Sequence, residues 1–319
     1  MTDADPSRFV IYLCHGGKKF FDQTIFSALT LLDLLLKQGR RDYRIVIYTD
    51  RPDAFPRHDL IRAIGLTPEE IVAYKGPLDY VHRTKLKVLQ RACADIGPAL
   101  HIYVDCDTRW LKLPDAAFDA LKDPLRDAPA AYFYENEGEI RRDFYPHYFR
   151  ALQKSGDLLR SFGLRPGPPW SIWNSGVVAF SENEIRAGIM NDIVALNDEL
   201  VFFFTPRNMV EQLALSLVAE NRCQMHSFGE FLVHYWRQTL ALPIVLERFF
   251  RSLGSNMPVE QMAQACAAFA IDEKDLQRIQ NEVAPRGIRK VAGKLRNSIR
   301  KRRIDLRAWR LWHSRSAHS

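Results

Sequence analysis

The sequence of 319 residues has few cysteines, no long hydrophobic run and no internal repeat. Its five cysteines are scattered and odd in number, without a Cys-x-x-Cys pair, which argues against a disulfide framework or a zinc site. No segment reaches the ~18 consecutive apolar residues of a membrane-spanning helix. The best candidate for such a helix, 29–36, is interrupted by Asp33. The first residues are acidic and polar, unlike a signal peptide, so we expect a cytoplasmic protein.

The net charge of +7 is distributed unevenly along the chain. Residues 286–315 contain twelve lysines and arginines and one acidic residue, a charge of +11, so the remaining residues sum to −4. The apolar residues of this segment recur at helical spacing and two tryptophans follow: Ile288, Val291, Leu295, Ile299, Trp309 and Trp312. Such a basic amphipathic helix is typical of binding to anionic membrane surfaces. Nucleic acid is the less favoured electrostatic partner, and a helix that only packs on the protein body is the alternative.

The order of the predicted elements indicates an α/β fold with a mixed, mainly parallel sheet. Strands are predicted at 9–14, 43–48, 71–74, 99–104, 130–134, 171–180 and 231–235. Helices are predicted at 21–36, 57–64, 82–94, 145–162, 184–200, 210–219 and beyond 243, and a polar loop at 135–145. A hydrophobic content of 47% is enough for the core of one large α/β domain with an appendage.

Two carboxylates, Asp105 and Asp107, follow the strand predicted at 99–104. Their side chains point the same way if the strand continues, and open α/β sheets bind ligands at the carboxyl ends of their strands. Paired carboxylates suit a hard divalent cation that substrate phosphates also hold. The motif therefore predicts a metal–diphosphate site, with capping of the following turn as the alternative.

Four segments in this order resemble the GT-A-fold glycosyltransferases, in particular the group of glycogenin and the bacterial lipopolysaccharide galactosyltransferases. They are Thr84-Lys85-Leu86, Tyr103-Val104-Asp105-Cys106-Asp107-Thr108, Trp173-Asn174-Ser175-Gly176-Val177 and Glu211-Gln212. The resemblance implies a GT-A-type, Rossmann-like sheet and hexosyl transfer from a nucleoside-diphosphate sugar, a UDP-sugar by preference, with Mn²⁺ or Mg²⁺. It makes 1–240 the nucleotide-sugar-binding catalytic domain and 241–319 a helical, basic C-terminal extension.

The resemblance also implies a metal site and three catalytic side chains, those of Asp105, Glu211 and Gln212. Asp105 faces the ribose and the metal, Asp107 binds the metal directly, and His234 completes the metal shell, with His226 as its competitor. Glu211 and Gln212 occupy the place of an Asp-Gln pair whose glutamine lies beside the anomeric carbon. Glu211 acting as a general base would instead fit an inverting enzyme, so both stereochemical outcomes stay open.

The donor-binding residues implied by the resemblance come from several segments. Lys85 offers its charge to a phosphate or to a sugar-binding carboxylate, with Arg83 and Lys87 as alternatives. The remaining donor-binding residues are His15 and Asp50 at the nucleotide rim, Cys106 within the Asp-x-Asp motif, and Asn174, Ser175 and Gly176 in the sugar pocket. Arg237 stands near the place where the relatives carry a Gly-x-x-Lys that grips the diphosphate, which this sequence lacks.

The acceptor implied by the resemblance is a saccharide or a lipid-linked saccharide, such as a cell-surface glycan. A lipid-linked acceptor would make membrane contact through 286–315 useful, so we expect a cytoplasmic enzyme that is peripheral at the inner face. Two other functions stay open. One is a binding protein that keeps the GT-A scaffold without catalysis, and the other is a metal-dependent nucleotidyltransferase.

Overall fold

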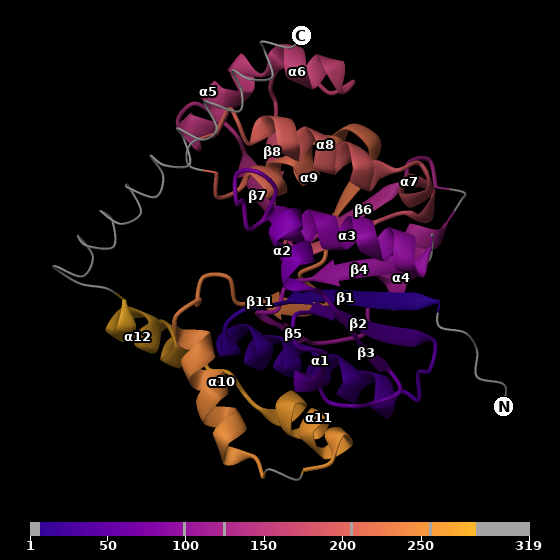
Figure 1. The fold of residues 1–319 in the computed structure, drawn as a ribbon, viewed down its shortest axis with the longest axis vertical. Coiled ribbons are helices and arrows are strands. Elements are labelled where there is room, and N and C mark those ends of the chain that lie inside the picture. The colour runs from indigo at the N-terminus through magenta and orange to yellow at the C-terminus, as the bar shows by residue number, and fades with distance from the viewer. Residues whose placement is uncertain (1–6, 98–99, 124–125, 205–206, 255–256, 285–319) are drawn as a thin grey trace.

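A seven-stranded sheet forms the centre of the computed structural model, which describes residues 7–97, 100–123, 126–204, 207–254 and 257–284 (Figure 1). Its strands are β1 (Arg8–Cys14), β2 (Tyr43–Thr49), β3 (Ile61–Gly65), β4 (Leu100–Val104), β6 (Ala130–Phe133), β9 (Val177–Phe180) and β10 (Gln224–Ser227). Their order is β10-β6-β9-β4-β1-β2-β3. All run in one direction except β9, which is antiparallel to both β4 and β6. The predicted α/β class with a mixed, mainly parallel sheet is therefore confirmed.

The inner strands are buried on both faces, and alternate residues point into two separate hydrophobic clusters. On β1, Val10 and Tyr12 belong to one cluster and Ile11 to the other, and all three side chains are fully buried. Strands covered on both faces require continuous apolar runs, which is why β1, β2 and β4 are readable from the sequence.

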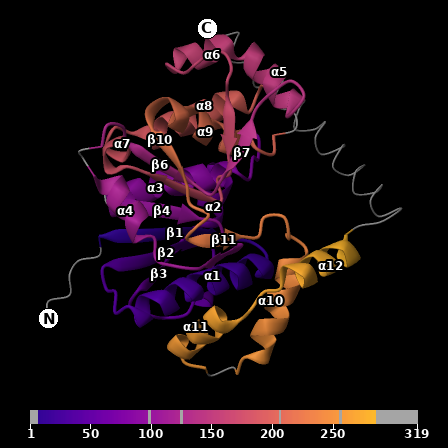
Figure 2. The same cartoon turned by 180° about the vertical axis from the view of Figure 1, so that it is seen from behind.

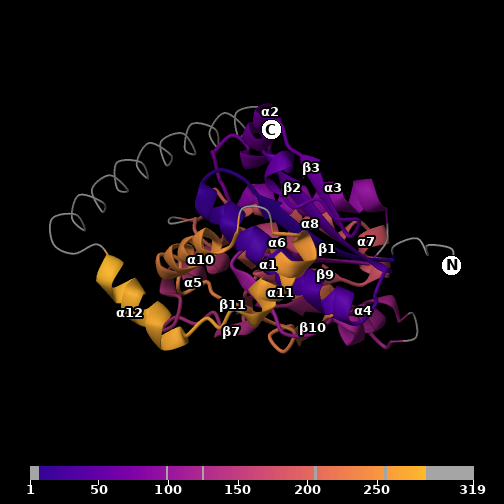
Figure 3. The same cartoon turned by 90° about the horizontal axis from the view of Figure 1, so that it is seen from below.

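Helices cover both faces of this sheet (Figures 1 and 2). On one face α1 packs against α10 and α11, as the view from below shows, and α12 packs on α10 (Figure 3). Their bounds are α1 (Lys18–Lys37), α10 (Ala241–Ser252), α11 (Val259–Ala268) and α12 (Glu273–Val283). The other elements of the helical layers are α2 (Pro68–Lys75), α3 (Arg83–Ile96), α4 (Asp115–Lys122), α5 (Pro146–Lys154), α6 (Gly156–Ser161), α7 (Glu182–Arg186), α8 (Ile189–Leu200) and α9 (Val210–Arg222), with a 3₁₀ turn, η1 (Pro52–Ala54).

Two antiparallel ribbons lie outside the central sheet. One joins β5 (Thr108–Trp110) to β11 (Leu232–His234), and the other joins β7 (Asn136–Glu139) to β8 (Ser171–Trp173). The sequence-based elements lack β5 and β10 and place β7 inside a loop. They also merge β8 with β9, whereas the turn between these strands carries the chain from one sheet to the other. The helices predicted at 145–162 and 184–200 are each divided in two.

Two short predictions are wrong in a reciprocal way. The second half of the helix predicted at 57–64 lies in the edge strand β3, and the strand predicted at 71–74 lies within the helix α2. At the start of α2 the Thr67 side chain accepts a hydrogen bond from the Glu70 amide, and the Glu70 side chain accepts one from the Thr67 amide. This capping box, followed by Pro68 at the first helical position, stabilises a helix start whatever the apolar pattern of the segment.

The described parts of the predicted extension, residues 241–254 and 257–284, contain the helices α10, α11 and α12. Leu246 of α10, Cys266 of α11 and Leu276 of α12 share one hydrophobic cluster with α1 and β1. The division at residue 240 stays a prediction. No helix among the described residues is long and apolar enough to cross a membrane. The basic segment 286–315 lies outside the described residues.

Candidate functional site

The site forms at one edge of the central sheet, where the carboxyl ends of parallel strands lie beside the start of the antiparallel strand β9. The carboxyl ends of the parallel strands β1, β2 and β4 lead into His15, Asp50 and Asp105. Because β9 runs the other way, its first residue Val177 pairs with Val104, the last residue of β4. The turn before β9 therefore meets the Asp-x-Asp motif, and the amide of Asp105 donates a 2.8 Å hydrogen bond to the carbonyl of Gly176.

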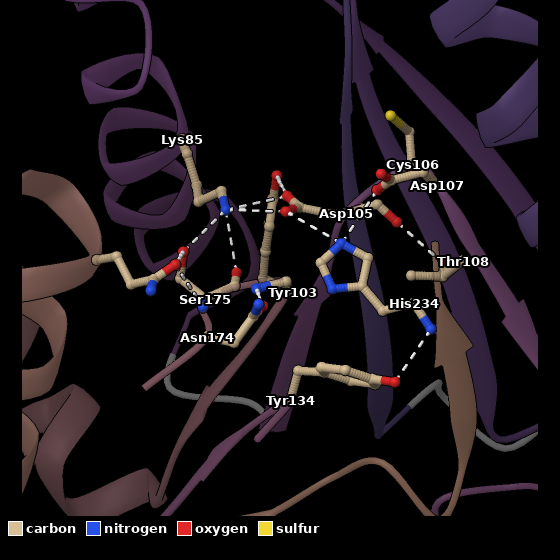
Figure 4. A network of polar contacts seen from close by, with 12 residues as sticks. Lys85, Tyr103, Asp105, Cys106, Asp107, Thr108, Tyr134, Asn174, Ser175 and His234 are labelled. Atoms are coloured by element: carbon tan, nitrogen blue, oxygen red, sulfur yellow. Dashed lines mark hydrogen bonds and ion pairs between the residues drawn. The ribbon is translucent and has the colours of Figure 1, made fainter. Parts of the chain in front are cut away.

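Asp105, Asp107 and His234 form a compact cluster of possible metal ligands (Figure 4). One ligand atom from each residue lies within 4.8 Å of the other two. The imidazole Nε2 is 3.2 Å from Oδ1 of Asp107 and 3.9 Å from Oδ2 of Asp105. The β5–β11 ribbon positions the histidine, because His234 is paired with Thr108, directly after Asp107.

Gly176 makes room for the imidazole of His234. A Cβ atom at position 176 would lie 2.9 Å from Nε2 of His234 and still closer to its Cε1 and Nδ1 atoms, so only glycine fits there. His234 is 8% exposed, and its buried Nδ1 has no hydrogen-bond partner among the residues that the structure describes. The ring is therefore held by packing on one side and faces the two carboxylates with Nε2.

Lys85 of α3 neutralises Asp105 from within the protein. Its Nζ lies 3.0 and 3.1 Å from the two oxygens of Asp105 and also contacts the carbonyl and hydroxyl of Ser175 (Figure 4). Burial favours the neutral acid, but the charges of Lys85 and His234 hold the pKa of Asp105 below its ordinary value. Burial and the same carboxylate raise the pKa of Tyr103 well above its usual range, so its hydroxyl donates to Asp105 at 2.8 Å. Of the two sequence alternatives, Arg83 pairs with Asp198 instead, and Lys87 contacts Gln90.

A buried chain of hydroxyl groups supports the turn that carries the carboxylates. It runs from the Trp110 indole N–H to Tyr12 at 2.7 Å, Ser27 at 2.9 Å, Thr108 at 2.6 Å and the Asp105 carbonyl at 3.0 Å. The indole can only donate and the carbonyl can only accept, so every hydroxyl in between donates toward Asp105. All four side chains are at most 3% exposed. The chain therefore ties α1, β1 and β5 to the start of the turn.

A second polar network surrounds the turn before β9. Gln212 of α9 accepts a hydrogen bond from the Ser175 amide at 3.3 Å and donates one to Glu137 of β7 at 3.3 Å. Asn174 accepts from the Gly176 amide at 2.9 Å and donates to Glu137 at 2.8 Å. Sequence reasoning missed Glu137, because the glutamates at 135, 137 and 139 look alike in a segment read as a loop.

Glu211, predicted beside Gln212, is 4% exposed. Its Oε2 accepts a 2.8 Å hydrogen bond from Tyr80, whose own pKa is raised well above its usual range by burial and by this carboxylate. Its Oε1 lies 3.5 Å from the Ser175 hydroxyl. Glu211 is thus joined to the pocket through Ser175 and to the protein body through Tyr80.

The predicted nucleotide rim lies at the ends of β1 and β2. The amide of Gly16 donates to Oδ2 of Asp50 at 3.0 Å, and the other, buried oxygen of Asp50 has no partner in the described part of the chain. Gly16 has a φ of +91°, which glycine adopts without strain. Burial lowers the pKa of His15, although the charge of Asp50 opposes this effect. The structure therefore brings Asp50 to the turn that follows His15.

Three further side chains contact groups other than the ligand atoms of Asp105, Asp107 and His234. The Cys106 thiol lies 3.7 Å from Gln23 of α1 and points away from His234, and burial followed by the charges of Asp107 and Asp105 raises its pKa (Figure 4). Arg237 is exposed and its guanidinium lies over the Trp236 ring. His226, the competitor of His234, stacks on Tyr132 in β6. The donor-binding roles of Cys106 and Arg237 stay predictions.

No protein-family model matches the sequence, and no curated protein is similar to it at a significant level. Solved structures of glycosyltransferases are similar to the chain. The galactosyltransferase LgtC in complex with donor and acceptor sugar analogs has 12% identity, covers 65% of this chain and 70% of its own, and has a TM-score of 0.37. Mouse xyloside xylosyltransferase 1 has 11% identity, coverages of 79% and 95%, and a TM-score of 0.42. The mannosyltransferase Ktr4p from S. cerevisiae has 11% identity, coverages of 72% and 70%, and a TM-score of 0.42.

Proposed function

We propose that the protein is a metal-dependent glycosyltransferase that moves a hexosyl group from a nucleoside-diphosphate sugar, by preference a UDP-sugar, to a saccharide or lipid-linked acceptor. The observation that carries this proposal is the cluster of Asp105, Asp107 and His234 at the carboxyl edge of the sheet. The cluster stands at the place where open α/β sheets bind ligands.

The donor set fits the divalent ion that the proposal requires. Two ligand atoms bound at a right angle, each about 2.1 Å from one ion, lie about 3 Å apart, and Nε2 of His234 is 3.2 Å from Oδ1 of Asp107. Carboxylate oxygens with one imidazole suit Mn²⁺, and Mg²⁺ to a lesser degree. The bound ion would act as a Lewis acid that stabilises charge on the leaving diphosphate.

The protein side chains divide the remaining work. Asp105 and Asp107 hold the ion, and Lys85 keeps Asp105 ionised and oriented. Asp50, held by the Gly16 amide beside the turn that follows His15, would stand at the nucleotide rim. Gln212 and the turn of Asn174, Ser175 and Gly176 line the sugar pocket. Glu211 is buried and bonded to Tyr80, so we assign it a positioning role rather than that of a general base.

A thermal-shift screen of nucleoside diphosphates with Mn²⁺ tests the proposal. A ligand present at 100 times its Kd stabilises the folded state by about 2.7 kcal/mol. We expect a shift that requires both UDP and the metal, together with metal-dependent hydrolysis of a UDP-sugar. Asp107→Asn should abolish both responses while the protein stays folded. The matched control is Asp127→Asn, because Asp127 is exposed and precedes β6 at the opposite edge of the sheet.

The outcomes separate the rival functions. Nucleotide binding without any hydrolysis or transfer would favour a binding protein, and release of pyrophosphate from a nucleoside triphosphate would favour a nucleotidyltransferase. An Asp107→Asn variant with the same thermal shift and the same rate of hydrolysis as the wild type would contradict the site assignment.

We further propose that residues 286–315 hold the enzyme at the inner face of a membrane, on the basis of their charge of +11 against −4 for the rest. Each basic residue near an anionic surface contributes about 1 kcal/mol, and salt screens the attraction. Reversing the charges of Arg300, Lys301, Arg302 and Arg303 should release the protein from phosphatidylserine vesicles without changing hydrolysis of the sugar nucleotide. Persistent vesicle binding, or tighter binding of the wild type to DNA, would contradict this part of the proposal.

A further inference from the structure

Glu137 lies between the two side-chain amides of the sugar pocket and contacts both. Its Oε1 accepts from Nδ2 of Asn174 at 2.8 Å, and its Oε2 accepts from Nε2 of Gln212 at 3.3 Å. The Tyr145 hydroxyl adds a donor at 3.4 Å. A side chain from the β7–β8 ribbon therefore contacts α9 and the turn before β9, two segments that lie far from it in the sequence.

The chemistry of these partners determines how both amides are oriented. Each amide also contacts a backbone N–H on the side away from Glu137. Asn174 faces the N–H of Gly176, and Gln212 faces the N–H of Ser175. A backbone N–H can only donate. An ionised carboxylate can only accept. Each amide must therefore turn its oxygen toward the turn and its NH₂ group toward Glu137. If either amide flipped, its NH₂ group would face the backbone N–H of the turn, and its oxygen would face the carboxylate of Glu137.

We propose that Glu137 is a positioning residue that fixes the orientation of the Asn174 and Gln212 amides for transfer of the sugar. This inference rests on the proposed function, since it assigns a task within the same pocket. Glu137 has no contact with the carboxylate cluster among the hydrogen bonds of the described residues. Its effect should therefore fall on the chemical step and not on binding of the metal or the nucleotide. A misplacement of about 1 Å in such a group lowers turnover by about 100-fold.

A double-mutant cycle tests the contact without reference to activity. Glu137→Gln places an NH₂ group against the NH₂ of one neighbouring amide, and Gln212→Glu places a carboxylate against a carboxylate. The double variant restores complementarity, because the amide at 137 can accept from Asn174 and donate to the carboxylate at 212. We expect each single variant to lower the melting temperature and the double variant to regain most of that loss. A double variant that only sums the two losses, or that fails to fold, would overturn the inference.

Kinetics then tests the positioning role. Glu137→Gln is expected to lower kcat for hydrolysis of the UDP-sugar by about 100-fold with little change in KM. Its Kd for UDP with Mn²⁺ should equal that of the wild type. The matched control is Glu139→Gln, a glutamate of the same strand whose side chain is exposed. An unchanged kcat in Glu137→Gln would overturn the positioning role. A wild-type protein that binds no nucleotide would instead contradict the proposed function, and the double-mutant cycle would then still test the contact between Glu137 and Gln212.

Discussion

Replacing Gly176 by alanine should disable the proposed metal site by displacing a histidine that belongs to another sheet. The added Cβ would lie 2.9 Å from Nε2 of His234 and closer to two other ring atoms, whereas ordinary contacts begin near 3.4 Å. The imidazole must move, because the backbone at position 176 is held in place by the hydrogen bond from the Asp105 amide to its carbonyl. Overpacking of this kind destabilises the folded state by about 1–3 kcal/mol.

The displacement should be visible as a loss of metal affinity. A ligand atom shifted by about 1 Å leaves the narrow range of metal–ligand bond lengths. We expect Mn²⁺ to bind about 10- to 100-fold more weakly, which corresponds to about 1.4–2.7 kcal/mol. Calorimetric titration with Mn²⁺ in the presence of UDP measures this change. Gly167→Ala is the control, because Gly167 has a negative φ and a Cβ there would meet no atom within 4 Å.

A second variant separates the clash from a general effect on folding. In a His234→Ala background the ring is gone, so Gly176→Ala should no longer lower the free energy of unfolding in the absence of metal. An equal loss in both backgrounds, or unchanged Mn²⁺ binding in folded Gly176→Ala, would refute the idea that position 176 acts through the imidazole.

Three further predictions concern single side chains. His234→Ala should weaken Mn²⁺ binding in the same titration whereas His226→Ala should not, and the reverse result would assign the ligand to His226. Tyr12→Phe should lower the free energy of unfolding by about 1–3 kcal/mol in urea, because it leaves the buried Trp110 indole without an acceptor and removes the donor to the Ser27 hydroxyl, which keeps its bond to Thr108; a smaller loss would mean that the buried chain is not formed. Hydrogen bonds from Arg40, against the opposing effect of burial, lower the pKa of Asp42, so this pair adds stability that is present at neutral pH and is lost as the pH falls through the carboxyl range. Arg40→Gln should therefore lower the melting temperature at neutral pH and much less at a pH of about 2, and an equal loss at both would contradict the assignment.

The parts of the fold that were predictable are those where one physical cause dominates. The strands β1, β2 and β4 are buried on both faces, so their apolar runs exceed what any solvent-exposed element carries. The edge strand β3 and the helix α2 have mixed patterns, and apolar spacing alone assigned them the wrong way round. The Thr67-Pro68-Glu69-Glu70 capping signal was present in the sequence and would have corrected α2.

Only the parts of the candidate site that belong to a local sequence motif were predictable. Asp105 and Asp107 follow a buried strand, which is a local signal. The place of Glu137 depends on the register between β7 and β8, and nothing in the sequence distinguishes it from Glu135 or Glu139. Gly176 was expected in the sugar pocket, and its close neighbour is the ring of His234, which no spacing rule could indicate.

The ribbon that joins β5 to β11 has a consequence for how a bound ion would be released. Asp107 and His234 are 127 residues apart in the chain and meet through a ladder of only three residue pairs. Short ladders open locally at a lower free energy than a seven-stranded sheet unfolds. Fraying of β11 alone would remove the imidazole and leave the two aspartates in place in the turn between β4 and β5. Ion exchange could then be much faster than global unfolding, and a growing chain could not assemble the complete ligand set before residue 234 had been synthesised.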